Sequence, residues 1–273
     1  MAGPQAAART ASAFATDAYA QTARYFVAYP EDVKLYRLSF NTALGTYAWQ
    51  GEASYRQDAP LLVDDVELLF AALGPINPGL AAFNQLGDFS GRFETVVPGV
   101  RRLDVSQFQT TVTKIFGPLL GADQGLLLWE GAVTHVHGMP AKDVLRFEGL
   151  GTYVSGNAVL GPAAHPGKPI EAPEHFADAT SWGYRLAGRL EYLNAFAGFN
   201  VVPSFAWQHD VDGVSPGPGG NFVEGLTALT LGLGFSRQNT WEFDLGYTRY
   251  SGAGRYNLIN DRDFVGVNAK YSF

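Results

Sequence analysis

The chain of 273 residues contains no cysteine, which excludes disulfide bonds and thiolate chemistry. Charged residues are also scarce, at 16% against about 25% in typical soluble domains. Acidic side chains outnumber basic ones by 26 to 19, which gives a formal net charge of -7. Because nucleic-acid binding needs a basic surface, this balance argues against a nucleic-acid partner.

Long hydrophobic runs are absent as well. No window reaches the roughly 18 consecutive apolar residues that a transmembrane helix needs. Residues 1–32 are rich in alanine near their start but lack the basic start and apolar core of a signal peptide. If the protein is exported, we expect its signal to have been removed or to lie upstream of Met1.

Aromatic residues, at 14%, and glycine, with 32 residues, are abundant. Both recur in segments that alternate between two kinds of side chain, such as WGYRLAGRLEYL at 182–193. Its apolar residues occupy one set of alternate positions, whereas Arg185, Arg189 and Glu191 belong to the other. A period of two is typical of a β-strand with two unlike faces. Similar patterns predict nine strands, at residues 33–44, 46–56, 103–116, 124–137, 182–193, 196–208, 223–237, 240–250 and 262–273.

Connections between these strands alternate between short and long. The long ones, at 57–102, 138–181, 209–222 and 251–261, contain proline-rich and glycine-rich stretches such as GVSPGPGGN. The stretch DDVELLFAALG within the first is compatible with a short helix. Short hairpins alternating with long loops favour an all-β, antiparallel, up-and-down arrangement of residues 33–273.

Aromatic residues near the ends of the apolar set distinguish a membrane β-barrel from a soluble sandwich. An arginine facing lipid would cost roughly 2–4 kcal/mol near the midplane, so Arg185 and Arg189 are expected to face the interior. We therefore predict a transmembrane β-barrel, with a large soluble antiparallel domain as the alternative. The predicted aromatic girdle on the lipid face comprises Tyr47, Trp49, Tyr55, Trp129, Trp182, Tyr184, Tyr192, Trp207, Trp241 and Tyr247.

The polar set of positions supplies candidate lumen residues of both charges. Ion pairs between neighbouring strands are one interpretation, and a polar constriction that selects solutes by charge and width is the other. Arg185, Arg189 and Glu191 beside Glu242 and Asp244 are the first candidates for such a constriction. The full predicted set is Arg37, Glu52, Arg56, Glu130, Arg185, Arg189, Glu191, Glu224, Glu242, Asp244 and Lys270.

The last residues, FVGVNAKYSF, resemble the sorting signal of outer-membrane barrels, with Gly266, Tyr271 and the terminal Phe273 as its parts. Barrel-assembly machinery and outer-membrane lipid are therefore expected partners. A complete barrel has an even number of strands. Nine strands thus predict that the chain is the C-terminal part of a larger barrel, with residues 1–32 in an extracellular loop.

Several segments resemble the C-terminal half of a proteobacterial family, the domain of unknown function 1302 (DUF1302). They include ARYFVAYPEDVKLYRLSFNT, DVELLFAALGP, SWGYRLAGRLEY, PSFAWQHDVDGVSPGPGGNFVEG and DRDFVGVNAKYSF, and the resemblance covers residues 23 to 273. It implies an outer-membrane barrel. It also implies that this chain has about half the length of a typical family member. It also suggests a role beside an envelope export system and hydrophobic-compound metabolism, without defined catalytic residues.

Motifs for other chemistry are weak. His135 and His137 share a strand face at a spacing that can bind zinc, but no third ligand is apparent. Asp210 and Asp212 precede Gly213 as in a calcium loop, but Asn221 stands at the position of the final acid. No GxSxG nucleophile motif occurs. We expect no metal, no cofactor and no enzyme activity.

The sequence thus predicts a bacterial outer-membrane channel or transporter for a small solute, which the resemblance implies could be hydrophobic. A membrane anchor with adhesive or assembly loops is one alternative. The translocating barrel of an autotransporter is another, and it would need about twelve strands and a helix through the pore.

Overall fold

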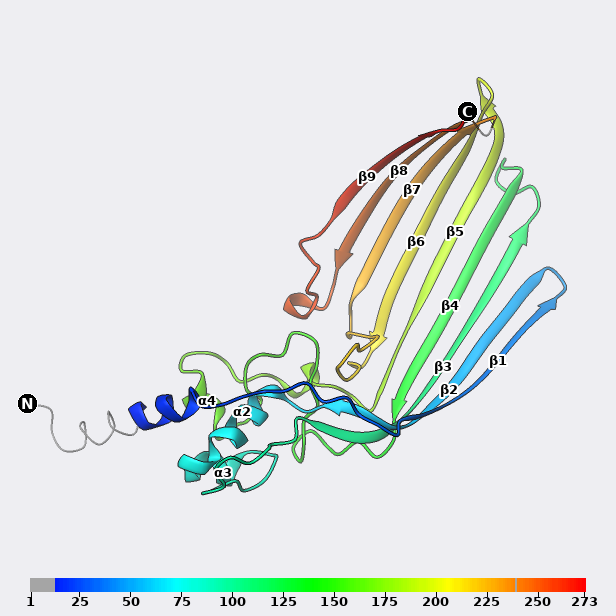
Figure 1. Ribbon diagram of the computed structural model, residues 1–273. Helices are drawn as coiled ribbons and strands as arrows, with labels where there is room; N and C mark the ends of the chain where they lie inside the picture. The colour runs from blue at the N-terminus through cyan, green and yellow to red at the C-terminus, as the bar shows by residue number, and fades with distance from the viewer. Residues whose placement is uncertain (1–12, 239) are drawn as a thin grey trace, which may run out of the picture.

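A computed structural model describes residues 13–238 and 240–273. These residues form one nine-stranded antiparallel sheet in which every strand pairs with its neighbours in sequence (Figure 1). The strands are β1 (Lys34–Leu44), β2 (Tyr47–Leu62), β3 (Val100–Phe116), β4 (Gln124–Val136), β5 (Thr180–Phe196), β6 (Phe199–Asp212), β7 (Thr227–Arg237), β8 (Trp241–Ser251) and β9 (Phe264–Tyr271).

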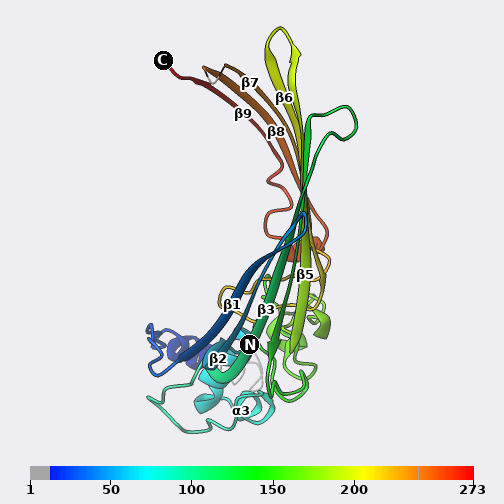
Figure 2. The same ribbon diagram turned by 90° about the vertical axis from the view of Figure 1, so that its right-hand side faces the viewer.

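The all-β prediction, the nine strands and their up-and-down order are confirmed. Strands β1 and β9 form the two edges of the sheet, and no ladder joins them in the described part of the chain. The sheet is therefore open rather than a closed barrel. Figure 2 shows it curving along its strands, with the long connections gathered at one end.

Several strand boundaries differ from the prediction. Strand β2 continues past a bulge after Arg56, so that Ala59 pairs with Leu103 and the first long connection shrinks to residues 63–99. The sequence at the bulge is polar and a proline follows it, so this part of β2 was predicted to be a loop. Strand β7 begins at Thr227 rather than 223, because the chain turns at Gly225 (φ 77°). Glu224 therefore belongs to a connection and not to a strand.

Helices occur in the long connections, beside the sheet rather than across it (Figure 1). The stretch DDVELLFAALG does form a helix, and the Asp64 side chain caps it by accepting a hydrogen bond from the Val66 backbone N–H at 3.0 Å. No described helix is long and apolar enough to span a membrane. The helical elements are α2 (Asp65–Leu73), α3 (Pro78–Phe83), α4 (Gly161–Ala164) and the 3₁₀ turns η1 (Gly74–Ile76), η2 (Pro173–His175) and η3 (Gly254–Tyr256).

Strand register gives the sheet two chemically distinct faces. One row of paired positions across β1 to β6 is polar and runs Asn41, Gln50, Thr111, Glu130, Arg185 and Gln208. The adjacent row on the other face runs Thr42, Trp49, Val112, Trp129, Leu186 and Trp207. We call the side that bears the first row the polar face and the opposite side the apolar face.

The long connections, residues 63–99, 137–179, 213–226 and 252–263, form what we call the cap. The main apolar core joins two of them to the ends of β2 and β4, through Leu61, Val136, Phe147 and their neighbours. On the polar face Thr134 and Val136 are buried near the cap, whereas on the apolar face His135 is exposed. The cap therefore folds over one end of the polar face and leaves the apolar face bare.

The segment before β1 lies at the cap end of the sheet (Figure 1). Residues 13–20 are helical, and the Tyr19 ring meets the Phe93 ring of the cap at a centroid distance of 5.9 Å. Arg102 donates a hydrogen bond to the Glu31 backbone carbonyl at 2.8 Å. The assignment of residues 1–32 to an extracellular loop stays a prediction, and its first twelve residues lie outside the described ones.

Candidate functional site

The polar face carries ten of the eleven predicted lumen residues, and only Glu224 lies elsewhere. Glu224 accepts a hydrogen bond from the Gly213 backbone N–H at 3.3 Å within the cap. The ten residues on the polar face, assigned by strand register, are Arg37, Glu52, Arg56, Glu130, Arg185, Arg189, Glu191, Glu242, Asp244 and Lys270.

Ion pairs on this face occur at the two edges of the sheet. Arg37 on β1 pairs with Glu52 on β2, and Lys270 on β9 pairs with Glu242 on β8 at 3.1 Å. The two central arginines on β5 differ, because neither Arg185 nor Arg189 forms a hydrogen bond or ion pair with a described side chain. The expected cross-strand pairs thus account for the edges but not for the middle of the sheet.

A hollow lies on the polar face towards the short-turn end of β5 to β8. Arg189 and Asp244 stand on its walls, and glycines of β7 form part of its lining. Of the five residues proposed for a constriction, the structure brings Arg189, Glu242 and Asp244 around this hollow, whereas Arg185 and Glu191 lie outside its lining. Its other lining residues are Val202, Ser204, Gly232, Leu233, Gly234, Phe235, Ser236, Leu245 and Gly246.

All ten predicted girdle residues lie on the apolar face. They are Tyr47, Trp49, Tyr55, Trp129, Trp182, Tyr184, Tyr192, Trp207, Trp241 and Tyr247. Among the described strand residues, charged side chains on this face occur only near its ends: for example, Arg249 near the cap, and Lys114 and Arg237 near the short turns. Between them, side chains such as Leu231 are half exposed without a packing layer over them (50%).

A buried ionic network holds the cap together. The Arg146 guanidinium donates a hydrogen bond to the Asp64 carboxylate at 3.0 Å and another to the Glu67 carboxylate, and all three side chains are nearly inaccessible to solvent. Asn157 donates to the same Glu67 carboxylate at 2.9 Å, and the Gln85 backbone N–H donates to its other oxygen at 2.8 Å. The network therefore joins connection 63–99 to connection 137–179.

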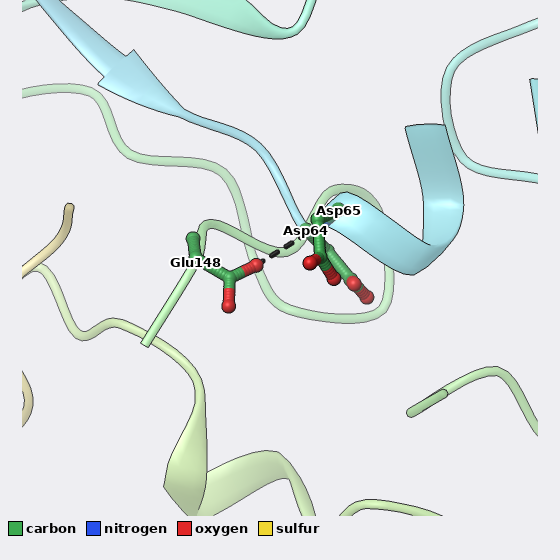
Figure 3. Close-up of side chains that lie close together, drawn as sticks. All are labelled: Asp64, Asp65 and Glu148. Carbon is green, nitrogen blue, oxygen red and sulfur yellow. Dashed lines mark hydrogen bonds between the residues drawn. The ribbon is translucent and has the colours of Figure 1, made fainter. Parts of the chain in front are cut away.

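Three carboxylates, of Asp64, Asp65 and Glu148, lie within 4.8 Å of one another at the start of α2 (Figure 3). Glu148 accepts hydrogen bonds from the Asp65 backbone N–H at 3.0 Å and from the Thr152 hydroxyl at 2.7 Å. Burial raises the pKa of Glu148 to about 7. Because Arg146 holds Asp64 and protein donors hold Glu148, these groups serve the cap's own structure, and we assign no metal to them.

A second cluster joins connection 252–263 to the rest of the cap. The buried Glu171 carboxylate accepts hydrogen bonds from Arg255, Tyr256 and His175. The rings of His175 and Tyr256 stack, with their centroids 3.8 Å apart. Burial opposes ionisation of Glu171, but these three hydrogen bonds outweigh it and hold its pKa below the usual value.

The weak metal motifs of the sequence have ordinary surroundings. His135 bonds to the Thr180 hydroxyl at 2.8 Å and His137 to the Ser106 hydroxyl at 2.7 Å, at the cap end of the apolar face. Asp210 accepts a hydrogen bond from the Val223 backbone N–H at 3.1 Å. It lies within β6, so the connection predicted at 209–222 begins only after Asp212.

The proposed sorting-signal residues lie at the short-turn end of the last strand. Gly266 pairs with Gly246 on β8, and Tyr271 pairs with Trp241, its ring centroid 4.6 Å from the indole. Phe273 follows the strand and is fully exposed. Their role in assembly stays a prediction.

A comparison with curated proteins found no match. The sequence does match a protein family whose description is "Protein of unknown function (DUF1302)", and the match extends over residues 6–273. Because this match spans nearly the whole chain, the protein belongs to the DUF1302 family.

Proposed function

We propose that the sheet is part of the wall of a bacterial outer-membrane β-barrel that conducts a small solute. The observation that carries the proposal is the contrast between the two faces. Among the described strand residues, the apolar face is exposed, free of charge in its middle and bordered by aromatic rings, whereas most strand charges lie on the polar face, one end of which the cap covers. Lipid on one side and an aqueous lumen on the other satisfy both faces.

The dimensions of the apolar face support a membrane location. On β4 its side chains run from Gly125, near the short turn, to His135, beside the cap. Ten residue steps of about 3.3 Å, tilted by about 40°, span about 25 Å. This is the height of the apolar band on outer-membrane barrels.

Strand polarity bears on how such a barrel would close. Strands β1 and β9 both run from the cap end towards the short turns (Figure 1). Direct pairing between them would be parallel, whereas an outer-membrane barrel is antiparallel throughout. Antiparallel closure therefore requires an odd number of further strands between these two edges.

The nature of the cap supports a position at the outer mouth, since long loops of such barrels lie outside the cell. Its surface exposes the apolar side chains of Leu69, Phe83, Phe93 and Val96, each more than half accessible. Such a surface favours a solute with an apolar part. It equally fits the alternative, in which the barrel anchors a cap that binds another protein.

Two adjacent positions on β9 test the membrane proposal directly. Val267 lies on the apolar face, 78% exposed, and Asn268 lies on the polar face. Val267→Arg would place a charge in lipid and weaken insertion of the folded protein by about 2–4 kcal/mol at the midplane. Asn268→Arg, the matched control, should insert normally. Equal insertion of both variants would contradict a lipid-facing apolar face.

Conduction is tested with the purified full-length protein in planar bilayers. The channel proposal expects discrete conductance steps in KCl. An inserted protein without conductance, whose cap captures a protein partner, would favour the anchor instead. The autotransporter alternative has less support, because the described residues form nine strands and helix 13–20 lies beside the cap.

A further inference from the structure

We propose that the hollow on the polar face binds small zwitterions, with the carboxylate of the solute beside Arg189 and its ammonium group beside Asp244. The inference rests on the proposed channel function, because it makes this hollow the place where the lumen selects its solute. The hollow combines glycine backbone, which bears no side chains, with two opposite charges that form no ion pairs with described side chains.

Part of the floor of the hollow, at Gly232 and Gly234, is backbone without side chains. A Cβ atom added at Gly232 would lie 2.5 Å from the Ser204 Oγ, and one added at Gly234 would lie 3.2 Å from the Asp244 Oδ1. A larger residue at Gly232 would displace the serine hydroxyl, and one at Gly234 would crowd the carboxylate. Glycine at both positions keeps the backbone accessible and the polar groups in place around it.

The two walls carry charges that differ from the paired ones nearby. Arg189 on β5 has no hydrogen bond or ion pair with any described side chain. From the described side chains, Asp244 on β8 accepts only one hydrogen bond, from Asn268 at 3.4 Å, whereas its neighbour Glu242 is paired with Lys270 at 3.1 Å. An arginine and an aspartate, neither of them in an ion pair with a described side chain, therefore line the same hollow.

The separation of these charges favours a dipolar ligand. Strands β5 and β8 are three strand spacings apart, about 14 Å along the sheet, and both charged side chains line the space between. A simple anion is attracted by Arg189 but repelled by Asp244. A simple cation is attracted by Asp244 but repelled by Arg189. A zwitterion aligned across the hollow gains from both charges at once, so the site discriminates by charge arrangement rather than by net charge.

The test measures binding and conduction on the same full-length protein in detergent and in planar bilayers. The probes are γ-aminobutyrate, whose charged groups are separated by three methylene groups, and the shorter glycine, with acetate and methylammonium as singly charged counterparts. Binding is read by saturation-transfer NMR and by block of the KCl current. We expect γ-aminobutyrate to bind more tightly than either single ion and more tightly than glycine, because the two charges of glycine are too close together to approach both walls of the hollow.

Variants locate the binding at the hollow. Arg189→Gln and Asp244→Asn should each weaken zwitterion binding about tenfold or more, as expected for a charged hydrogen bond. The exchange Arg189→Asp with Asp244→Arg should recover it, because the solute can bind in the reverse orientation. Arg37→Gln removes a paired arginine from the same face and should leave binding unchanged.

The outcomes separate this inference from the channel proposal. Conductance without binding of γ-aminobutyrate, or acetate binding as tight as that of γ-aminobutyrate, would overturn the inference alone. Zwitterion binding that disappears in both single variants but returns in the exchange would support it. The same binding in a protein that never conducts would still support the site while overturning the channel.

Discussion

Replacing Arg146 by methionine should open the cap while leaving the sheet intact. Among the described residues, Arg146 supplies the only guanidinium that contacts the carboxylates of Asp64 and Glu67, whose residues are 1% and 0% exposed. Removing one partner of a buried ion pair leaves the remaining charges uncompensated, at a cost of about 3–5 kcal/mol. At about 1.4 kcal/mol per factor of ten, the open cap should become about 10² to 10⁴ times more populated.

Hydrogen–deuterium exchange in detergent micelles measures this opening. Amides of α2 should exchange faster by that factor in the Arg146→Met variant, and amides of β4 should not change. Arg92→Met, which removes an exposed arginine from the same cap connection, serves as the control.

Adding Asp64→Asn and Glu67→Gln to Arg146→Met should restore much of the protection, because no uncompensated charge then remains buried. Unchanged exchange in Arg146→Met relative to Arg92→Met would refute the reasoning. So would a triple variant that exchanges as fast as the single one.

Two further predictions concern the cap and the sheet. Glu148, whose pKa is raised to about 7 from 4.5, holds its proton more tightly in the folded cap than in an open one, so its stabilising contribution is present below about pH 4.5 and is lost as the pH rises through about 7. Exchange in the cap, corrected for intrinsic rates, should therefore accelerate between pH 5 and pH 8, and Glu148→Gln should flatten this dependence. Gly183→Ala would place a Cβ 2.7 Å from the His209 carbonyl oxygen and should destabilise the β5–β6 pairing by about 1–3 kcal/mol, whereas Gly246→Ala, whose nearest atom would be 3.9 Å away, should be tolerated. The temperature at which the folded band disappears in gel-shift assays compares the two glycine variants.

Strands and faces could be predicted because the period of two is a property of extended backbone itself. Trp129 and Glu130 point to opposite sides wherever the strand lies, so their alternation assigns the faces without knowledge of the neighbours. Strand ends depend instead on partners distant in sequence. Ala59 lies in a strand because Leu103 pairs with it across a bulge, and nothing local announces that pairing.

The interior of the cap could not be predicted for a related reason. Arg146 and Glu67 are 79 positions apart and belong to segments without regular periodicity. A charge in such a segment is ordinarily solvated, so the sequence offers no signal that two of them meet in a buried network. The Glu171 cluster, whose donors Arg255 and Tyr256 lie 84 and 85 positions away, was missed in the same way.

The positions of the cap and the hollow give the proposed channel two successive steps of selection. The cap covers the polar face at one end of the strands, and its buried ionic networks make it a fixed layer rather than a loose loop. The hollow lies nearer the other end, and Arg189 and Asp244 both line it. A solute entering at the cap would thus meet an apolar surface first and a dipolar site second. The cap would then select solutes by apolar contacts and the hollow by charge arrangement, at different depths of the channel. A substitution in the cap or in the hollow should therefore change one kind of selectivity without abolishing the other kind.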